Sequence, residues 1–348
     1  MTRFTRRTVV AGLAALPVAK FVGPRSTAAQ GTPAATGVEI IVLSNSSPHV
    51  TVIDAASRAV TRTADIPDFT SWTWNDDNNY SDGTLLWLGV RNPDTEDAEV
   101  VTLDLDSLEL TNRIPVGKDS MSLYIGKVAN DGILLVGKMG SGEVVTIDTA
   151  TFAVLDTWAV PVNGDVVCDA DIATLPDGSQ RFVYPTRKGE TVVSIDAVTG
   201  ETLFEISNDA GTNPLMLSTD RDGRSWVQES GSKTNAVYDT DLELVGRFPT
   251  GDGPIVNTFS PDGAYSYIGH GGDTIVQVID TATLEEVARV QAGTNPQKIA
   301  VHPDGHEIYA ILTEEAAVAV IDTATWEVSD RIEVGTEPAG ISVRGVQA

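Results

Sequence analysis

Cysteine and histidine are scarce in this chain, and their scarcity excludes several classes of protein. Cys168 is the single cysteine among 348 residues, so no intrachain disulfide can form and stability has to come from burial and strand pairing. No Cys-x-x-Cys-His sequence is present, which excludes covalent attachment of c-type haem. The chain also lacks Gly-x-Ser-x-Gly and His-Glu-x-x-His motifs, so it predicts neither a nucleophile elbow nor a zinc-protease helix.

Basic residues are in deficit. The chain has 23 Lys and Arg against 49 Asp and Glu, and its formal net charge is −26 at pH 7. A surface of this charge repels nucleic acids and anionic lipids. We therefore predict no nucleic-acid partner and no membrane insertion once an export signal is removed. Acidic loops favour cationic or polyhydroxyl ligands over anions.

A long hydrophobic run is also missing. The apolar stretch near the N-terminus, residues 9–22, contains Lys20 and is too short to span a bilayer comfortably. It overlaps Thr5-Arg6-Arg7-Thr8-Val9-Val10, which resembles a twin-arginine signal. We predict an export signal over residues 1–29, a linker over residues 30–37, and a mature protein in the periplasm, on the cell surface or secreted. Retention of the segment as an N-terminal anchor is the alternative.

What the sequence does contain is a repeat. Seven short apolar runs each end in an aspartate, and successive aspartates lie 41 to 50 residues apart. A period in the forties with four short strands per unit is typical of propeller blades. A turn glycine opens a strand in each unit, and six of the seven glycines follow an aspartate, which is a strong hairpin signal. The aspartates are Asp54, Asp104, Asp148, Asp196, Asp239, Asp280 and Asp322; the glycines are Gly37, Gly83, Gly132, Gly178, Gly223, Gly263 and Gly305.

The two ends of the repeat complement each other. The first unit begins at its second strand, at Val38, whereas the chain finishes with an extra first strand over residues 338–343. Joining the two ends removes two unpaired sheet edges. We therefore predict an all-β fold, a single seven-bladed β-propeller over residues 38–348. Its blades are four-stranded, and the C-terminal strand closes the first blade.

Residues 293–325 carry a family resemblance. Gly-Thr-Asn-Pro, His-Pro-Asp-Gly, Ile-Tyr-Ala and Val-Ile-Asp-Thr-Ala-Thr follow one another there. Together they resemble the YVTN-type β-propeller repeats of exported bacterial and archaeal proteins, and the likeness extends more loosely over the other blades. The resemblance implies the seven-bladed fold. It implies no single activity, because propellers of this type include binding proteins, surface-layer proteins and enzyme subunits.

The repeat aspartates are better explained by the fold than by chemistry. Each precedes a short string such as Thr323-Ala324-Thr325. Its carboxylate can therefore accept hydrogen bonds from the backbone N–H groups of the turn that follows. We predict a structural function for all seven.

Candidate ligand residues lie on the face where the loops between blades meet those joining second to third strands, around the central channel. Aligned on the turn glycines, Asp171 and Lys298 occupy a position that is Met216 and Val256 in two other blades. A charge at this apolar position indicates a ligand at the channel mouth or, alternatively, a hydrated charge at the end of a water-filled channel. The predicted ligand-binding residues are Asp171, Lys298, Asp252, Asp119, His270 and His49.

Two groups of loop residues could each form a metal site, although both could also be ordinary surface residues. Residues 75–83 crowd Asn and Asp oxygens that suit Ca²⁺, although the spacing of a calcium loop is missing. His49 and His270 lie in equivalent loops of blades one and six, and imidazole suits zinc or copper. Blade seven stands between those two blades, however, which argues against a shared ion. Our main interpretation contains no metal and no cofactor.

No nucleophile with an adjacent base stands out, so the sequence predicts a non-catalytic function. The main hypothesis is an exported, monomeric binding or interaction module that holds a small polar ligand or a protein partner at the channel mouth. The alternatives are a propeller enzyme or enzyme subunit, lactonase-like or quinoprotein dehydrogenase-like, and a periplasmic metal-binding protein. Both enzyme types share the propeller architecture.

Overall fold

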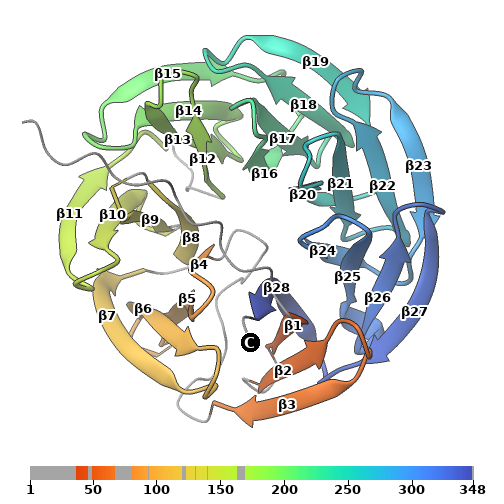
Figure 1. Cartoon of the computed structure of the whole chain (residues 1–348). Coiled ribbons are helices and arrows are strands. Elements are labelled where there is room, and N and C mark those ends of the chain that lie inside the picture. The colour runs from red at the N-terminus through yellow and green to blue at the C-terminus, as the bar shows by residue number, and fades with distance from the viewer. Residues whose placement is uncertain are drawn as a thin grey trace, which may run out of the picture. The chain divides into compact units, whose positions relative to one another are not determined.

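A computed structural model describes residues 37–45, 49–66, 80–92, 94–119, 123–129, 131–138, 140–162 and 169–346. In this part of the chain, 28 strands and one 3₁₀ turn, η1 (Thr313–Glu315), form seven antiparallel four-stranded sheets. The sheets stand in a ring like the blades of a propeller (Figure 1). The predicted seven-bladed β-propeller is therefore confirmed. Among the described residues, no helix is long and apolar enough to cross a membrane.

Each blade runs from an innermost strand beside the channel to an outermost strand at the rim (Figure 1). The first four blades are, from inside to outside, β28 (Pro338–Val346), β1 (Gly37–Ser44), β2 (His49–Asp54), β3 (Val60–Asp65); β4 (Tyr80–Ser81), β5 (Leu85–Arg91), β6 (Asp97–Asp104), β7 (Leu110–Lys118); β8 (Leu123–Val128), β9 (Ile133–Lys138), β10 (Glu143–Asp148), β11 (Val154–Ala159); β12 (Asp171–Thr174), β13 (Gln180–Thr186), β14 (Thr191–Asp196), β15 (Thr202–Ser207). The last three are β16 (Pro214–Thr219), β17 (Ser225–Glu229), β18 (Thr234–Tyr238), β19 (Leu244–Pro249); β20 (Pro254–Phe259), β21 (Tyr265–His270), β22 (Ile275–Asp280), β23 (Glu286–Gln291); β24 (Pro296–Val301), β25 (Glu307–Leu312), β26 (Ala317–Asp322), β27 (Glu327–Glu333).

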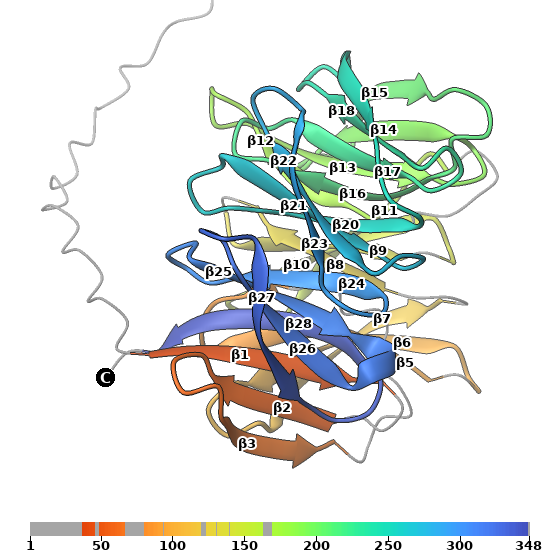
Figure 2. The same cartoon turned by 90° about the vertical axis from the view of Figure 1, so that its right-hand side faces the viewer.

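The C-terminal strand closes the ring, as predicted. β28 pairs antiparallel with β1, with Ile40 opposite Val343 and Leu43 opposite Gly340. The two strands lie side by side in the view from the side (Figure 2). Blade one thus takes its innermost strand from one end of the chain and its other three strands from the opposite end.

Strand β1 shows why the inner strands are continuously apolar. Ile41 and Leu43 pack in a cluster with blade two, whereas Ile40 and Val42 pack in a cluster with blade seven. Side chains alternate between the two faces of a strand, and in a propeller both faces of a blade meet a neighbouring blade. All four side chains are therefore buried. Burying apolar surface stabilises the folded state by about 25 cal/mol for each Å² removed from water.

The repeat aspartates close the turns between the third and fourth strands. In blade seven, Oδ1 of Asp322 accepts hydrogen bonds from the backbone N–H groups of Ala324 and Thr325, both at 2.9 Å. Trp326, four residues after the aspartate, takes a left-handed conformation with φ of 57° and donates its N–H to the carbonyl of Asp322. Gly200 occupies the corresponding position of blade four, with φ of 71°. The structural interpretation of these aspartates is consistent with these contacts.

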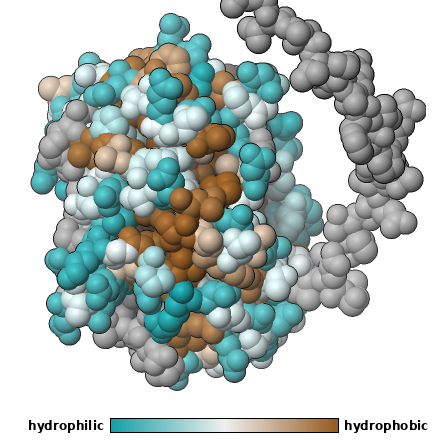
Figure 3. Space-filling model, turned by 90° about the vertical axis from the view of Figure 1, so that its left-hand side faces the viewer, coloured by the Kyte–Doolittle hydropathy of each residue, from teal (hydrophilic) through white to brown (hydrophobic). Residues whose placement is uncertain are grey.

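The outer wall of the ring exposes some apolar groups. On the side where β11 lies in Figure 1, brown apolar patches interrupt the polar surface (Figure 3). Leu155 of β11 is 54% exposed and Val198, between β14 and β15, is 71% exposed. Both border a groove of about 340 Å³ between blades three and four. Each outermost strand pairs with only one other strand of its sheet. Its apolar residues are therefore less completely covered than those of the inner strands.

Candidate functional site

The candidate site is a cavity of about 680 Å³ in the central channel. It is walled by the innermost strands β8, β12, β16, β20, β24 and β28, which surround the centre of the ring (Figure 1). Polar and apolar groups share its surface. The polar ones relevant to ligand binding are Lys127, Asp171, Ser218, Thr219, Asp220, Arg221, Asn257 and Thr258.

The cavity lies toward the far end of the channel from the predicted ligand face. Its walls include residues 257–259 at the end of β20 and 299–301 at the end of β24, and it continues to the Asp-Gly turns at Arg221 and Pro261. The predicted site, by contrast, is formed by the loops that enter these strands. The sequence located the channel, but the cavity that the structure describes opens along its other half.

Lys127 and Asp171 form the charged centre of the cavity. Nζ of Lys127, on β8, lies 2.7 Å from Oδ2 of Asp171, on β12. The Asp171 carboxylate is fully buried, whereas the Lys127 side chain is 49% exposed. Lys127 has three N–H donors and gives one to Asp171. The pair as a whole is neutral, but its ammonium end faces the channel and has donors left for a ligand.

Asp171 also joins blade four to blade five. Its Oδ2 accepts hydrogen bonds from the backbone N–H of Thr219 at 2.8 Å and from the Thr219 hydroxyl at 2.9 Å. Asp169 acts in the same way two residues earlier, because its Oδ2 accepts the N–H of Leu217 at 3.0 Å. These N–H groups belong to the inner edge of β16, which no strand covers. The two carboxylates thus satisfy sheet-edge donors that would otherwise be costly to leave unpaired.

A buried amide network lies behind the cavity wall, and sequence reasoning missed it. Oδ1 of Asn257, on β20, accepts hydrogen bonds from the side-chain amides of Asn235, at 2.8 Å, and Gln228. Nδ2 of Asn257 donates to the hydroxyl of Ser266 at 2.9 Å. All four side chains are at most 1% exposed. Asn235 carries a sequence signal like that of Asp171, because the other six blades have valine four residues before the repeat aspartate.

Lys298 is buried in blade seven, whereas the Lys127–Asp171 pair joins blades three and four. It lies in β24 at the position that aligns with Asp171, and it is 2% exposed. The cavity lining begins one residue later, at Ile299. The structure thus brings Asp171 to the cavity and leaves Lys298 just outside its lining.

Asp119 and Asp252 have local partners on the predicted face. Asp119 is 2% exposed, and its carboxylate accepts the backbone N–H groups of Gly140 and Ser141 at 3.0 to 3.1 Å. It thereby fastens the end of blade two to a loop of blade three. Asp252 is exposed and pairs with Lys233 at 3.0 Å. Neither residue lies on the described cavity.

The two predicted histidines also have structural partners. His270 is fully buried; its Nδ1 lies 3.0 Å from the carbonyl of Ile275, and its Nε2 accepts the N–H of Gly251 at 3.1 Å. Burial lowers the pKa of His270, so the neutral ring with a proton on Nδ1 fits both contacts. His49 is partly exposed, with Nδ1 2.7 Å from Oδ1 of Asp65. Both ring nitrogens of His270 are occupied, which leaves no lone pair for the metal considered from the sequence.

The predicted Ca²⁺ loop lies mainly outside the described residues, since residues 75–79 are among those not described. Its described end is a turn. Oδ1 of Asp82 accepts the backbone N–H groups of Thr84 and Leu85 at 2.8 and 2.7 Å.

A group of metal-ligating side chains occurs elsewhere, on the turn of blade seven. Among the described residues, His302, Asp304 and His306 are the three whose ligand atoms all lie within 4.8 Å of one another. In the sequence, the two histidines flank Pro303-Asp304-Gly305, and neither is among the ligand-binding residues predicted above.

No protein-family model and no curated protein sequence matches this chain. Several solved structures share its fold. The periplasmic gluconolactonase of Pseudomonas aeruginosa is 16% identical, with a TM-score of 0.69 over 89% of this chain and 100% of its own. A proposed 6-phosphogluconolactonase from Bacteroides fragilis is 15% identical, with a TM-score of 0.66 over 88% and 98%. A streptogramin B lyase is 14% identical, with a TM-score of 0.62 over 89% and 92%. At these identities the likeness shows the fold alone.

Proposed function

We propose that this chain is a lactonase-like propeller, which binds a polyhydroxyl lactone in the channel cavity and opens its ring. The observation that carries the proposal is the Lys127–Asp171 pair, a half-exposed ammonium held at 2.7 Å by a buried carboxylate on the wall of a 680 Å³ cavity. One of the solved neighbours named above is described as a gluconolactonase and another as a proposed 6-phosphogluconolactonase, which supports this activity over the non-catalytic hypothesis drawn from the sequence.

The proposed reaction is the hydrolysis of a lactone. A water oxygen bonds to the lactone carbonyl carbon, the carbonyl oxygen takes up negative charge, and the acyl C–O bond then breaks. The attacking water gives up one proton and the ring oxygen gains one as it leaves, so lactone and water together give a hydroxy acid. The Lys127 ammonium would stabilise the charge on the carbonyl oxygen, as fixed donors do in other acyl transfers. Asp171 is a positioning residue that fixes the ammonium.

The cavity favours a neutral sugar lactone over a phosphorylated one. Ser218 and Thr219 line it, and their hydroxyl oxygens can accept hydrogen bonds from sugar hydroxyls. The acidic chain, of net charge −26, repels a phosphate dianion at long range. We therefore expect a glucono-lactone to be preferred over its 6-phosphate.

A second candidate function, ligand binding without turnover, rests on one specific observation. Both carboxylates on the described cavity wall are already engaged by donors. Asp171 accepts from Lys127 and Thr219, and Asp220 accepts from Arg224 and the Trp226 indole. Neither is available as a general base without breaking these contacts. A propeller that only binds the lactone or its hydroxy acid would not need to break the hydrogen bonds and ion pairs of these two carboxylates.

The experiment is lactone hydrolysis by the purified mature chain, followed as acid release above the spontaneous rate with glucono-δ-lactone as probe. We expect turnover by the wild type and a loss of about 100-fold in Lys127→Met, the usual scale for removing one oxyanion donor. Lys233→Met is the matched control, because Lys233 is a surface lysine paired with Asp252 and should leave turnover unchanged. Calorimetric binding of the lactone or gluconate without turnover would establish the second candidate instead.

We further propose that the repeats belong to the YVTN type and that the chain works outside the cytoplasm. Support for the first comes from the motifs of residues 293–325, and for the second from the N-terminal signal pattern. The gluconolactonase of Pseudomonas aeruginosa is described as periplasmic, which agrees with export. Cell fractionation tests the location.

A further inference from the structure

The turn between β24 and β25, in blade seven, gathers three side chains around one point. Nδ1 of His302 lies 2.6 Å from Oδ1 of Asp304. Nδ1 of His306 contacts the same oxygen. The two imidazole rings stand edge to face with centroids 4.1 Å apart. Two ring nitrogens therefore converge on one carboxylate oxygen within a five-residue turn.

The corresponding turn of blade six shows that the fold does not need these histidines. There the sequence is Ser260-Pro261-Asp262-Gly263-Ala264, in place of His302-Pro303-Asp304-Gly305-His306. Asp262 accepts the Ser260 hydroxyl at 2.6 Å and the Ala264 N–H at 3.0 Å. Asp304 accepts the His306 N–H at 3.1 Å in the same way. A serine and an alanine thus suffice to form this turn, and the imidazoles of blade seven are additional to it.

The ligand set matches a divalent transition metal. Imidazole nitrogen suits zinc, copper, iron and nickel, and a carboxylate completes sets of two histidines and one acid. Zinc binds histidine nitrogen at about 2.0 to 2.1 Å and carboxylate oxygen at about 2.0 to 2.2 Å. Ligand atoms within 4.8 Å of one another can meet these distances after a small adjustment of exposed side chains. His306 and Asp304 are 54% and 64% exposed, so their rotamers have room to adjust.

Other side chains of blade seven and blade one lie close to the two histidines. The Glu307 carboxylate, 10% exposed, lies 3.8 Å from Nε2 of His306. Arg58 and the Tyr309 hydroxyl hold that carboxylate in turn. A carboxylate near the outer nitrogen of a metal-bound histidine orients the ring and raises its basicity. The centroids of the His302 and Tyr309 rings are 6.5 Å apart. The His302 side chain is 13% exposed.

We propose that His302, Asp304 and His306 bind one divalent transition-metal ion such as Zn²⁺, through the two Nδ1 atoms and the Asp304 carboxylate. Three protein ligands leave at least one coordination position open, as in catalytic rather than closed structural zinc sites. Asp304 and Gly305 also border a cavity of about 280 Å³ that Tyr265, Tyr267 and Trp326 line. A ligand oxygen can therefore reach the metal from a pocket with aromatic walls. The site shares no residue with the Lys127–Asp171 pair.

The test is calorimetric titration of the tag-free mature protein with Zn²⁺ at pH 7.5. The main variant is His302→Ser with His306→Ala, which recreates the sequence of the blade-six turn and should fold normally. His49→Gln is the matched control, since His49 is also a partly exposed histidine hydrogen-bonded to an aspartate. We expect one Zn²⁺ per chain in the wild type and in the control, at least tenfold weaker binding in the double variant, and equal melting temperatures for all three without metal.

A spectroscopic readout identifies the ligands independently of affinity. Cu²⁺ bound to the wild type should show nitrogen hyperfine coupling from two imidazoles in electron paramagnetic resonance, and Asp304→Asn should keep the two nitrogens while weakening binding. The proposal is wrong if the wild type gives no heat with Zn²⁺ up to millimolar concentration. It is equally wrong if the double variant binds Zn²⁺ as tightly as the wild type does.

Discussion

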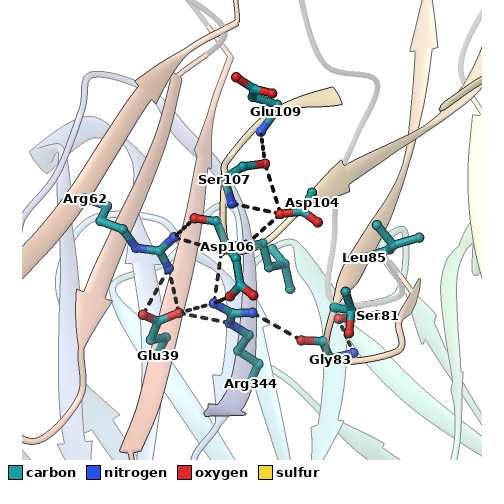
Figure 4. A network of polar contacts seen from close by, with 12 residues as sticks. Glu39, Arg62, Ser81, Gly83, Leu85, Asp104, Asp106, Ser107, Glu109 and Arg344 are labelled. Carbon is teal, nitrogen blue, oxygen red and sulfur yellow. Dashed lines mark hydrogen bonds and ion pairs between the residues drawn. The ribbon is translucent and has the colours of Figure 1, made fainter. Parts of the chain in front are cut away.

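Arg344 and Glu39 are separated by 305 residues in the sequence, yet Nε of Arg344 donates to Oε2 of Glu39 at 2.9 Å. The contact joins the C-terminal strand β28 to β1 and extends into blade two (Figure 4). There the Arg344 guanidinium donates to the carbonyl of Leu105 at 3.0 Å and to the carboxylate of Asp106 at 2.8 Å. Arg62, on β3, reaches the same glutamate at 2.8 Å. One buried arginine thus holds together both ends of the chain and the neighbouring blade.

Replacing this arginine should destabilise the ring. The Arg344 side chain is 7% exposed, so Arg344→Ala removes a buried donor from Glu39 and from the Leu105 carbonyl, which then keep only Arg62 as a side-chain donor. Removing one partner of a buried ion pair typically costs about 3 to 5 kcal/mol of stability. We expect the free energy of unfolding to fall by an amount at the lower end of this range, because Arg62 still pairs with Glu39. Urea denaturation measures it.

Arg113→Ala is the control for that experiment. Its pair with Glu99 is 42% and 29% exposed, and exposed pairs contribute about 0 to 1 kcal/mol. If the two arginine variants lower the free energy of unfolding equally, the Arg344 contacts contribute no more to stability than an exposed ion pair.

Removing the closing strand should have a larger effect. Deleting residues 340–348 takes away most of β28 and the ladder from Leu43 to Gly37 of β1. The inner edge of β1 would then be unpaired, and an exposed edge of this kind promotes aggregation. We expect a large fall in melting temperature or insoluble protein. A truncated chain that melts with the wild type would mean that the ring closes in another way.

Two acidic residues predicted from the sequence as ligand groups should now differ in their effect on stability. Asp171→Ala leaves the buried N–H of Thr219 without its acceptor, and it also removes the partner of the half-exposed Lys127 ammonium. Unsatisfied buried groups cost about 1 to 3 kcal/mol each, so thermal unfolding should occur well below that of the wild type. Asp252→Ala removes one exposed pair and should change stability by about 0.5 kcal/mol or less. Similar melting temperatures for both variants would contradict the structural function of Asp171.

The turn aspartates should make the protein sensitive to acid. Hydrogen bonds from Thr151, Thr283 and Thr325 lower the pKa of Asp148, Asp280 and Asp322 respectively. A carboxyl group whose pKa is lower in the folded state stabilises it above the unfolded-state pKa, which is about 3.9, and this stabilisation is lost as the pH falls through the folded-state pKa.

Melting temperatures between pH 6 and pH 2 measure this dependence. Replacing all three aspartates by asparagine keeps an acceptor in each turn but removes its titration. The triple variant should therefore lose less stability than the wild type on acidification. Parallel curves for the two proteins would show that other carboxylates control the acid transition.

Export can be tested through the paired arginines of the N-terminal segment. Arg6→Lys together with Arg7→Lys should trap the precursor in the cytoplasm if the folded-protein route is used, because that route reads the arginine pair itself. Immunoblots of cell fractions follow the precursor and the mature form. Normal export of the double variant would point to the general secretory route.

The fold could be predicted because its determinants are local and repeated. Each blade carries its own turn signals, such as Asp304-Gly305 and Asp322, and the period of the repeat then defines the architecture. The spare strand at residues 338–343 predicted the closure without any contact being known. Periodicity and strand count are properties of the chain itself, so the amino-acid sequence by itself determined the seven-bladed ring.

The site depended on the tertiary structure. Alignment selected Asp171 as unusual, but only folding brings it to Lys127, 44 residues away, and to Thr219, 48 residues away. The same folding buries His270 between backbone groups and places His302 and His306 on one aspartate oxygen. Charge and residue type are fixed along the chain, whereas burial and hydrogen-bond partners are set by contacts between blades. Those contacts alone decided which polar residues support the ring and which face a cavity.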